Sequence, residues 1–227
     1  MLKLQKYKIG VFLMQNKKVV LITIVALLAL FLVAGYVYKN KQSEEYANIS
    51  KSEALVFQRP YSVVIGNEDA KVQLVEFFDP ACGTCAQFHP YVKDIMKENE
   101  GKIKLVLRYA PFHQNSDYAV KMLEGAREQG LFMEALEFMF ATQVYWIKNH
   151  VVNPKQLWAL LANVKGLDME KLAAFMNNNK TADEIIAQDL KDAETLKADK
   201  TPSYFVNGKP LQEFGLENLK KLINSEL

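Results

Sequence analysis

Two apolar runs of seven residues, with a helical segment between them, set the fold class of this chain. The first, Val72–Phe78, is nearly all apolar, as in a strand covered on both faces. Residues 86–99 have the apolar spacing of a helix, which Gly101 ends, and Ile103–Tyr109 is the second run. A strand, a helix and a strand in so short a stretch predict a βαβ unit with two parallel strands and a right-handed crossover. We therefore predict an α/β protein.

The stretch after this unit is predicted to be helical. Residues 116–199 contain no convincing strand, and apolar spacing indicates helices over 118–129 and 131–146. Further helices are expected to start at Pro154, Asp168 and Thr181. The Met- and Phe-rich stripe within 131–146 is expected to be core, and an exposed groove that grips unfolded chains is the alternative. We expect an all-helical subdomain inserted at about 115–199.

Short strand signals lie on both sides of these segments. Residues 61–65 are predicted to form a strand before the βαβ unit, and residues 203–206 another after the helices. The dipeptide Asn207-Gly208 is a strong signal for a two-residue hairpin turn, so a return strand is expected from Lys209. A helix over 216–227 completes the predicted domain.

An uncharged segment of twenty residues, Val19–Tyr38, lies ahead of all these elements. A helix of that length spans roughly 30 Å, the thickness of a bilayer core. Five lysines precede it, whereas Glu44 and Glu45 follow it. The positive-inside rule then predicts that the N-terminus stays in the cytoplasm and that the rest of the chain is exported. A cleaved signal peptide, with its cleavage site near residues 33–35, is the alternative.

Charge separates the two ends of the chain. Residues 1–40 contain six lysines and no acid, so 22 of the 28 basic residues remain after them, against all 26 acidic ones. This mildly acidic bulk excludes a strongly basic nucleic-acid-binding surface. We divide the chain into a cytoplasmic basic tail at 1–18, a transmembrane anchor at 19–38, a polar stalk at 39–59 and a folded domain at 60–227, with residues 55–57 of the stalk touching the domain.

Both cysteines of the chain, Cys82 and Cys85, lie where the first buried run meets the helix. Free backbone N–H groups and the positive end of the helix dipole stabilise an anion there, so the pKa of Cys82 is expected below the ~8.5 of a free thiol. Cys85 lies one turn further on and is expected to be more buried. Two cysteines exclude a multi-disulfide scaffold and a four-cysteine metal site. A zinc site completed by His89 and His113, or an inert disulfide, is the alternative to thiol–disulfide exchange.

Residues 60–227 resemble the DsbA-like family of exported thiol–disulfide oxidoreductases. The resemblance rests on VQLVEFFDPACGTCAQF at 72–88, on the long helical stretch, and on TPSYFVNG at 201–208. It implies a thioredoxin-like fold with an inserted all-helical subdomain, here preceded by one N-terminal transmembrane helix. It also implies an enzyme that uses its redox-active cysteine pair, with no cofactor and no metal.

The resemblance assigns roles to individual residues. Cys82 is implied to be the attacking cysteine and Cys85 the resolving one. Pro202 is implied to be a cis-proline whose loop packs beside the pair, and the backbone of Thr201 is then free to pair with an extended substrate peptide.

The dipeptide between the cysteines departs from the family pattern. The best-known strong oxidants of the family carry Pro-His there, whereas this chain has Gly83-Thr84. The position has no histidine to hydrogen-bond Cys82, although Thr84 offers a hydroxyl and a backbone N–H. We therefore expect a less oxidising protein, and we include Gly83 and Thr84 with Thr201 in the predicted substrate-binding surface.

Glu76, six residues before Cys82, occupies the strand that the family uses for a buried acid. An inward carboxyl there can accept the proton of Cys85 through water, with its pKa raised by desolvation. An ordinary charge at a strand end is the alternative. Lys104 or Arg108 on the next strand is the candidate partner of Glu76, and His89 is expected on the helix surface.

These features predict a membrane-tethered protein thiol–disulfide oxidoreductase that oxidises the cysteines of exported proteins. We expect it at the bacterial inner membrane as a single-pass protein, with the catalytic domain on the periplasmic side. Its expected partners are exported thiol proteins and a membrane redox protein that recycles it, with no nucleic acid, and it is expected to be a monomer. A reductase or an isomerase in the same compartment is the alternative, although residues 39–59 leave no room for the dimerisation domain of an isomerase. A metal-binding or chaperone module is the remaining reading.

Overall fold

The computed structural model describes residues 17–52, 54–178 and 180–227. Contacts divide the chain into one unit that ends at Glu45 and a second unit, Tyr46–Leu227. The helices are α1 (Lys17–Ser52), the 3-10 helix η1 (Ala54–Val56), α2 (Gly83–Glu98), α3 (Ser116–Arg127), α4 (Phe132–Trp146), α5 (Pro154–Leu161), α6 (Met169–Asn177), α7 (Lys180–Thr195) and α8 (Leu216–Asn224). The strands are β1 (Val63–Gly66), β2 (Val72–Phe78), β3 (Ile103–Tyr109), β4 (Ile147–Lys148), β5 (Val151–Val152), β6 (Ser203–Val206) and β7 (Lys209–Pro210).

The predicted apolar helix at the N-terminus is present. Helix α1 continues through Ser52, so the first part of the predicted stalk is helical as well. Its segment Lys18–Tyr46 has a mean hydropathy of 2.8 and is long and apolar enough to cross a membrane, as a signal sequence also is. Membrane anchoring and the division of the chain at 59/60 stay predictions.

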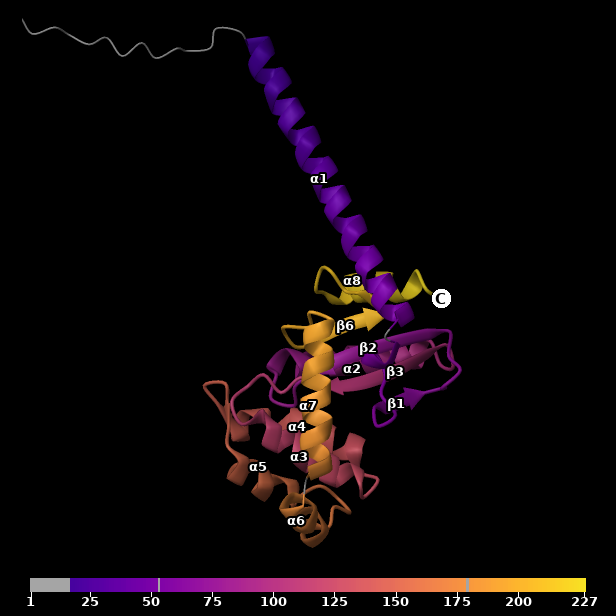
Figure 1. Ribbon diagram of the computed structural model, residues 1–227. Coiled ribbons are helices and arrows are strands. Elements are labelled where there is room, and N and C mark those ends of the chain that lie inside the picture. The colour runs from indigo at the N-terminus through magenta and orange to yellow at the C-terminus, as the bar shows by residue number, and fades with distance from the viewer. Residues whose placement is uncertain (1–16, 53, 179) are drawn as a thin grey trace, which may run out of the picture. The chain divides into compact units, whose positions relative to one another are not determined.

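A five-stranded mixed sheet in the order β1-β3-β2-β6-β7 forms the centre of the second unit (Figure 1). Strands β2 and β3 are parallel and are joined by α2, as the βαβ prediction requires, and their neighbours β1 and β6 run antiparallel to them. The predicted thioredoxin-like α/β fold is therefore confirmed.

The two faces of the sheet carry separate cores. Leu74 and Phe78 of β2 point into the larger core, which includes side chains of α2, α8 and the helices α3–α6. Val75 and Phe77 point into the smaller core, where the end of α7, η1 and Tyr46 pack. This alternation along β2 decides which of its side chains can reach the cysteines.

The helical insertion lies between β3 and β6, with α3–α6 grouped beside the sheet (Figure 1). The Met- and Phe-rich stripe belongs to the core, since Phe132, Met139 and Trp146 are buried. The prediction of no strand in 116–199 is wrong, because β4 and β5 form a small antiparallel hairpin. Each of these strands has two residues, which is shorter than the four to eight that strand patterning needs.

Candidate active site

Cys82 is the N-cap of α2. Strand β2 ends at Phe78, and the turn that follows is closed by a hydrogen bond of 2.9 Å from the Cys82 N–H to the Asp79 carbonyl. The Cys82 Sγ accepts the N–H of Cys85 at 3.4 Å, as a capping side chain does. In its thiol form Cys82 donates to the carbonyl of Thr201 at 3.2 Å. The sulfur is therefore held between the helix start and the loop before β6.

The two cysteines have opposite electrostatic environments. Hydrogen bonding from Cys85 lowers the pKa of Cys82 to about 6, against the opposing effect of burial. Cys85 is fully buried, and desolvation together with Cys82 raises its pKa well above the ordinary value. At neutral pH the pair is thus a thiolate at Cys82 beside a thiol at Cys85, in line with the sequence expectation.

The predicted loop before β6 lies against Cys82. The peptide bond between Thr201 and Pro202 is cis, as the resemblance implies. Thr201, Gly83 and Thr84 line one groove of about 1150 Å³ together with Cys82. A Cβ at Gly83 would have nothing within 4 Å, so the helix start at this position is open. Their roles in binding a substrate stay predictions.

Glu76 is buried, but its partner is not the predicted cation. The hydroxyl of Tyr204, on the neighbouring strand β6, donates to its Oε1 at 3.1 Å. Burial raises the pKa of Glu76 to about 8, although the Tyr204 hydrogen bond opposes this shift. Because its pKa lies close to neutral pH, the Glu76 carboxyl can take up and release a proton beside the cysteines.

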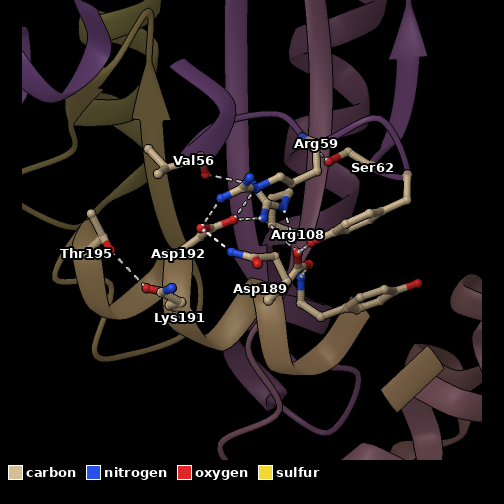
Figure 2. A network of polar contacts seen from close by, with 11 residues as sticks. Val56, Arg59, Ser62, Arg108, Asp189, Lys191, Asp192 and Thr195 are labelled. Carbon is tan, nitrogen blue, oxygen red and sulfur yellow. Dashed lines mark hydrogen bonds and ion pairs between the residues drawn. The ribbon is translucent and has the colours of Figure 1, made fainter. Parts of the chain in front are cut away.

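The predicted pairing of Glu76 with Arg108 or Lys104 is wrong. In the parallel register Phe77 lies opposite Arg108 and Gln73 opposite Lys104, so both cations share the face of the odd-numbered β2 residues. Glu76 points to the other face. Arg108 instead forms the buried network of Figure 2, with Asp189 at 2.7 Å and Asp192 at 2.6 Å.

Sequence reasoning missed a second group of side chains in the same groove. The carboxylate of Asp79, fully buried at the end of β2, pairs with the Nδ1 of His113 at 2.7 Å. The His113 ring stacks on that of His150, with centroids 5.7 Å apart and an interplanar angle of 22°. Both rings line the groove with Cys82. The sequence does contain one signal for this group, because Asp79 directly follows the first buried strand of the βαβ unit.

His89 does not join His113 in a zinc site. It is buried rather than on the helix surface, because it packs on the Phe140 ring of α4, and its Nε2 lies 3.6 Å from the Oε1 of Glu137. Desolvation lowers the pKa of His89. Within residues 17–52, 54–178 and 180–227, no group of three or more His, Cys, Asp and Glu side chains is arranged to hold a metal ion.

Comparison with known proteins gives the family of this chain. The chain matches the Thioredoxin family over residues 58–225. It is 31% identical over 147 residues to a Na(+)/H(+) antiporter NhaA of Herminiimonas arsenicoxydans, covering 65% of this chain and 22% of the antiporter. It is 24% identical over 169 residues to a protein of Rickettsia typhi named as a protein-disulfide oxidoreductase, covering 73% of this chain and 62% of that protein. The chain thus spans less than two thirds of these relatives.

Solved structures share the same fold. Oxidised BdbD of Bacillus subtilis is 25% identical, with a TM-score of 0.60 over 73% of this chain and 92% of that one. The α-DsbA1 of Wolbachia pipientis is 18% identical, with a TM-score of 0.66 over 77% of this chain and 95% of that one, a likeness of fold alone. Because the family match extends over residues 58–225, the chain belongs to the thioredoxin family.

Proposed function

We propose that this chain is a protein thiol–disulfide oxidoreductase that oxidises pairs of cysteines in exported proteins. The observation that carries the proposal is the asymmetry of its cysteine pair. Cys82 caps a helix, borders an open groove and has a lowered pKa, whereas Cys85 is buried behind it with a raised pKa. The names of the Rickettsia typhi relative and of the DsbA structures support the same class of activity.

The reaction begins with the Cys82–Cys85 disulfide. A substrate thiolate attacks the Cys82 sulfur, which breaks the bond between the two cysteines and forms a mixed disulfide with Cys82. Cys85 leaves as a thiolate and takes up a proton, and we propose that the buried Glu76 carboxyl supplies it. A second substrate thiolate then attacks the substrate sulfur, and Cys82 leaves as a thiolate. The substrate loses two electrons and the cysteine pair gains them.

The oxidising direction follows from the stability of the reduced state. A thiolate stabilised at Cys82 is a good leaving group, and it favours the dithiol form of the enzyme over its disulfide form. Gly83-Thr84 in place of Pro-His weakens this effect, so we propose a milder oxidant than the strongest members of the family. No added cofactor is needed, because the cysteine pair itself carries the electrons.

We propose that α1 anchors the chain in the bacterial inner membrane, with the second unit on the periplasmic side. The length and hydropathy of α1 and the basic residues before Val19 support this location. Exported thiol proteins are then the substrates, a membrane redox protein reoxidises the pair, and the chain acts as a monomer. Alkylation of Cys82 by a membrane-impermeant reagent, in whole cells first treated with a thiol reductant that opens the disulfide, tests the location. Protection of the reduced Cys82 until the membrane is lysed contradicts it.

The activity is tested with the oxidised protein and a reduced peptide that contains two cysteines. We expect the peptide to gain a disulfide as the protein becomes reduced. Cys82→Ser should abolish the reaction. Cys85→Ser, first converted by glutathione disulfide to a Cys82–glutathione mixed disulfide, should exchange with a peptide thiolate, which releases glutathione and leaves a Cys82–peptide disulfide that mass spectrometry detects. Equilibration with glutathione gives the direction. A potential near the roughly −270 mV of thioredoxin would favour a reductase and overturn the oxidising role.

A further inference from the structure

Asp79 holds the His113 ring in one orientation. The Oδ2 of Asp79 accepts the backbone N–H of His113 at 3.0 Å and pairs with its Nδ1 at 2.7 Å. Its Oδ1 accepts the N–H of Ala81 at 2.8 Å and the hydroxyl of Ser116. Both oxygens of this buried carboxylate are thus occupied, so the aspartate is fixed and the histidine is fixed by it.

The hairpin β4–β5 brings the second imidazole to the same place. Asn149 and His150 form its turn, with φ of 52° and 63° at the two central positions. Such turns favour Asn and Gly, and His is also enriched at positive φ. The hairpin is tied to the loop that carries His113, because the Val152 N–H donates to the Gln114 carbonyl at 3.0 Å. The stacked rings are therefore held from both sides.

The stacked rings share a groove with the reacting sulfur. Cys82, His113 and His150 border the same groove. The Asp79 hydrogen bond raises the pKa of His113, burial opposes this shift, and the Cys82 charge adds to it. The interaction of His113 with Cys82 is thus favourable when the sulfur is a thiolate and the ring is an imidazolium.

The position of Asp79 favours a positive charge on His113. The His150 ring stacks on His113, with centroids 5.7 Å apart. The other charged groups around the groove are Asp199 and Lys200 of the loop before β6, while Glu76 faces the cysteines from β2.

We propose that His113, fixed by Asp79 and covered by His150, is the electrostatic partner that stabilises the Cys82 thiolate. This inference rests on the proposed exchange activity and assigns to the loop after β3 a positive charge that the Gly83-Thr84 dipeptide cannot supply. When the second substrate thiolate attacks, the bond between the substrate sulfur and Cys82 breaks and its electron pair stays on Cys82. The imidazolium offsets this new charge, and no proton moves in the step.

The test compares three histidine variants in the full chain. We expect His113→Gln to raise the pKa of Cys82 by about one unit, because an opposite charge nearby is lost. Its equilibrium with glutathione should shift up to about tenfold toward the disulfide form, which corresponds to about 30 mV. His150→Gln should change both quantities in the same direction by less. His89→Gln is the matched control, because His89 lies outside the groove, and it should keep the wild-type potential.

A spectroscopic readout separates charge stabilisation from a structural role. The His113 ring should titrate at a higher pH in the dithiol protein than in the disulfide protein, because oxidation removes the thiolate. This NMR measurement uses the wild-type chain and stays decisive even if His113→Gln unfolds. Equal titration in the two redox states, or a folded His113→Gln with unchanged Cys82 pKa and potential, overturns the inference. The proposed function falls separately, if the wild-type protein itself oxidises no peptide.

Discussion

Single residues of this site were predictable when their chemistry depends on local chain geometry. A cysteine at the start of a helix meets free N–H groups in any such turn, so the environment of Cys82 follows from its position. His113 and Asp79 are 34 residues apart, and only the folded chain brings them together. The wrong prediction of Arg108 as a partner of Glu76 has another cause. The two-residue period of a strand already places Arg108 on the opposite face, once the parallel register is drawn.

Replacing Glu76 with glutamine tests the buried acid through the pH dependence of stability. In the folded protein burial raises the pKa of Glu76 to about 8, whereas the unfolded chain titrates near ~4.3. Between these values only the folded state keeps the proton, so folding stability falls as the pH rises. Glu76→Gln cannot titrate and escapes this loss. We compare the free energies of unfolding of the reduced proteins in urea. The difference between variant and wild type should change in favour of the variant by on the order of 4 kcal/mol from about pH 4 to about pH 8.

Glu226→Gln is the control for this measurement. Lys209 lowers the pKa of Glu226, so this carboxylate is ionised in the folded and the unfolded chain from about pH 5 upward. Its variant should follow the wild-type pH dependence across that range. If Glu76→Gln also runs parallel to the wild type, Glu76 does not hold a proton in the folded protein.

Among the elements, the long ones and the strands next to clear turn signals were predictable, whereas the hairpin of β4 and β5 was not. The apolar patterns of α2, β2 and β3 extend over seven or more residues, so the sequence alone predicts these elements without knowledge of tertiary contacts. The hairpin of β4 and β5 is joined to the loop after β3 by a bridge between Val151 of β5 and Gln114, which lies outside the hairpin. The sequence therefore predicted the βαβ unit but not the hairpin that carries His150.

The packing of α7 on the sheet is expected to depend on Arg108. Its side chain is fully buried and binds Asp189, Asp192 and the carbonyl of Val56, so it joins β3, α7 and η1 (Figure 2). Arg108→Met removes the positive charge that balances the buried carboxylates of Asp189 and Asp192. The free energy of unfolding should therefore fall by about 3–5 kcal/mol.

Arg59→Met is the matched comparison for Arg108→Met. The Arg59 side chain is 22% exposed and, among the described residues, forms its ion pair with Asp192. Its removal leaves Asp192 bound to Arg108. We expect a loss of about 1 kcal/mol in the same urea titration. Equal losses for the two variants would show that the buried position of Arg108 adds nothing to the network.

At the scale of the whole molecule, composition locates the apolar helix but not the start of the folded unit. The mostly polar composition of residues 39–59 suggests a stalk, yet three side chains of this segment belong to the smaller core. Val56 and Phe57 are 3% exposed, and the hydroxyl of Tyr46 donates to the Leu196 carbonyl at 3.0 Å. Phe205 contacts the rings of Tyr46 and Phe57. The sequence predicts that residues 55–57 touch the domain, and Val56 and Phe57 do so. Tyr46 is an isolated apolar residue in a polar stretch and shows no period, so only packing reveals its place in the core.

Two truncations test where the folded unit begins. A chain that starts at Tyr46 keeps the whole smaller core and should unfold in urea at the same midpoint as the domain of the full chain. A chain that starts at Pro60 loses Tyr46, Val56 and Phe57. Burial of such side chains contributes about 1.5–3 kcal/mol each, so this chain should lose about 5 kcal/mol or more, which is a large share of the stability of a typical domain. Equal midpoints for the two truncations would restore the boundary at 59/60 that the sequence suggests.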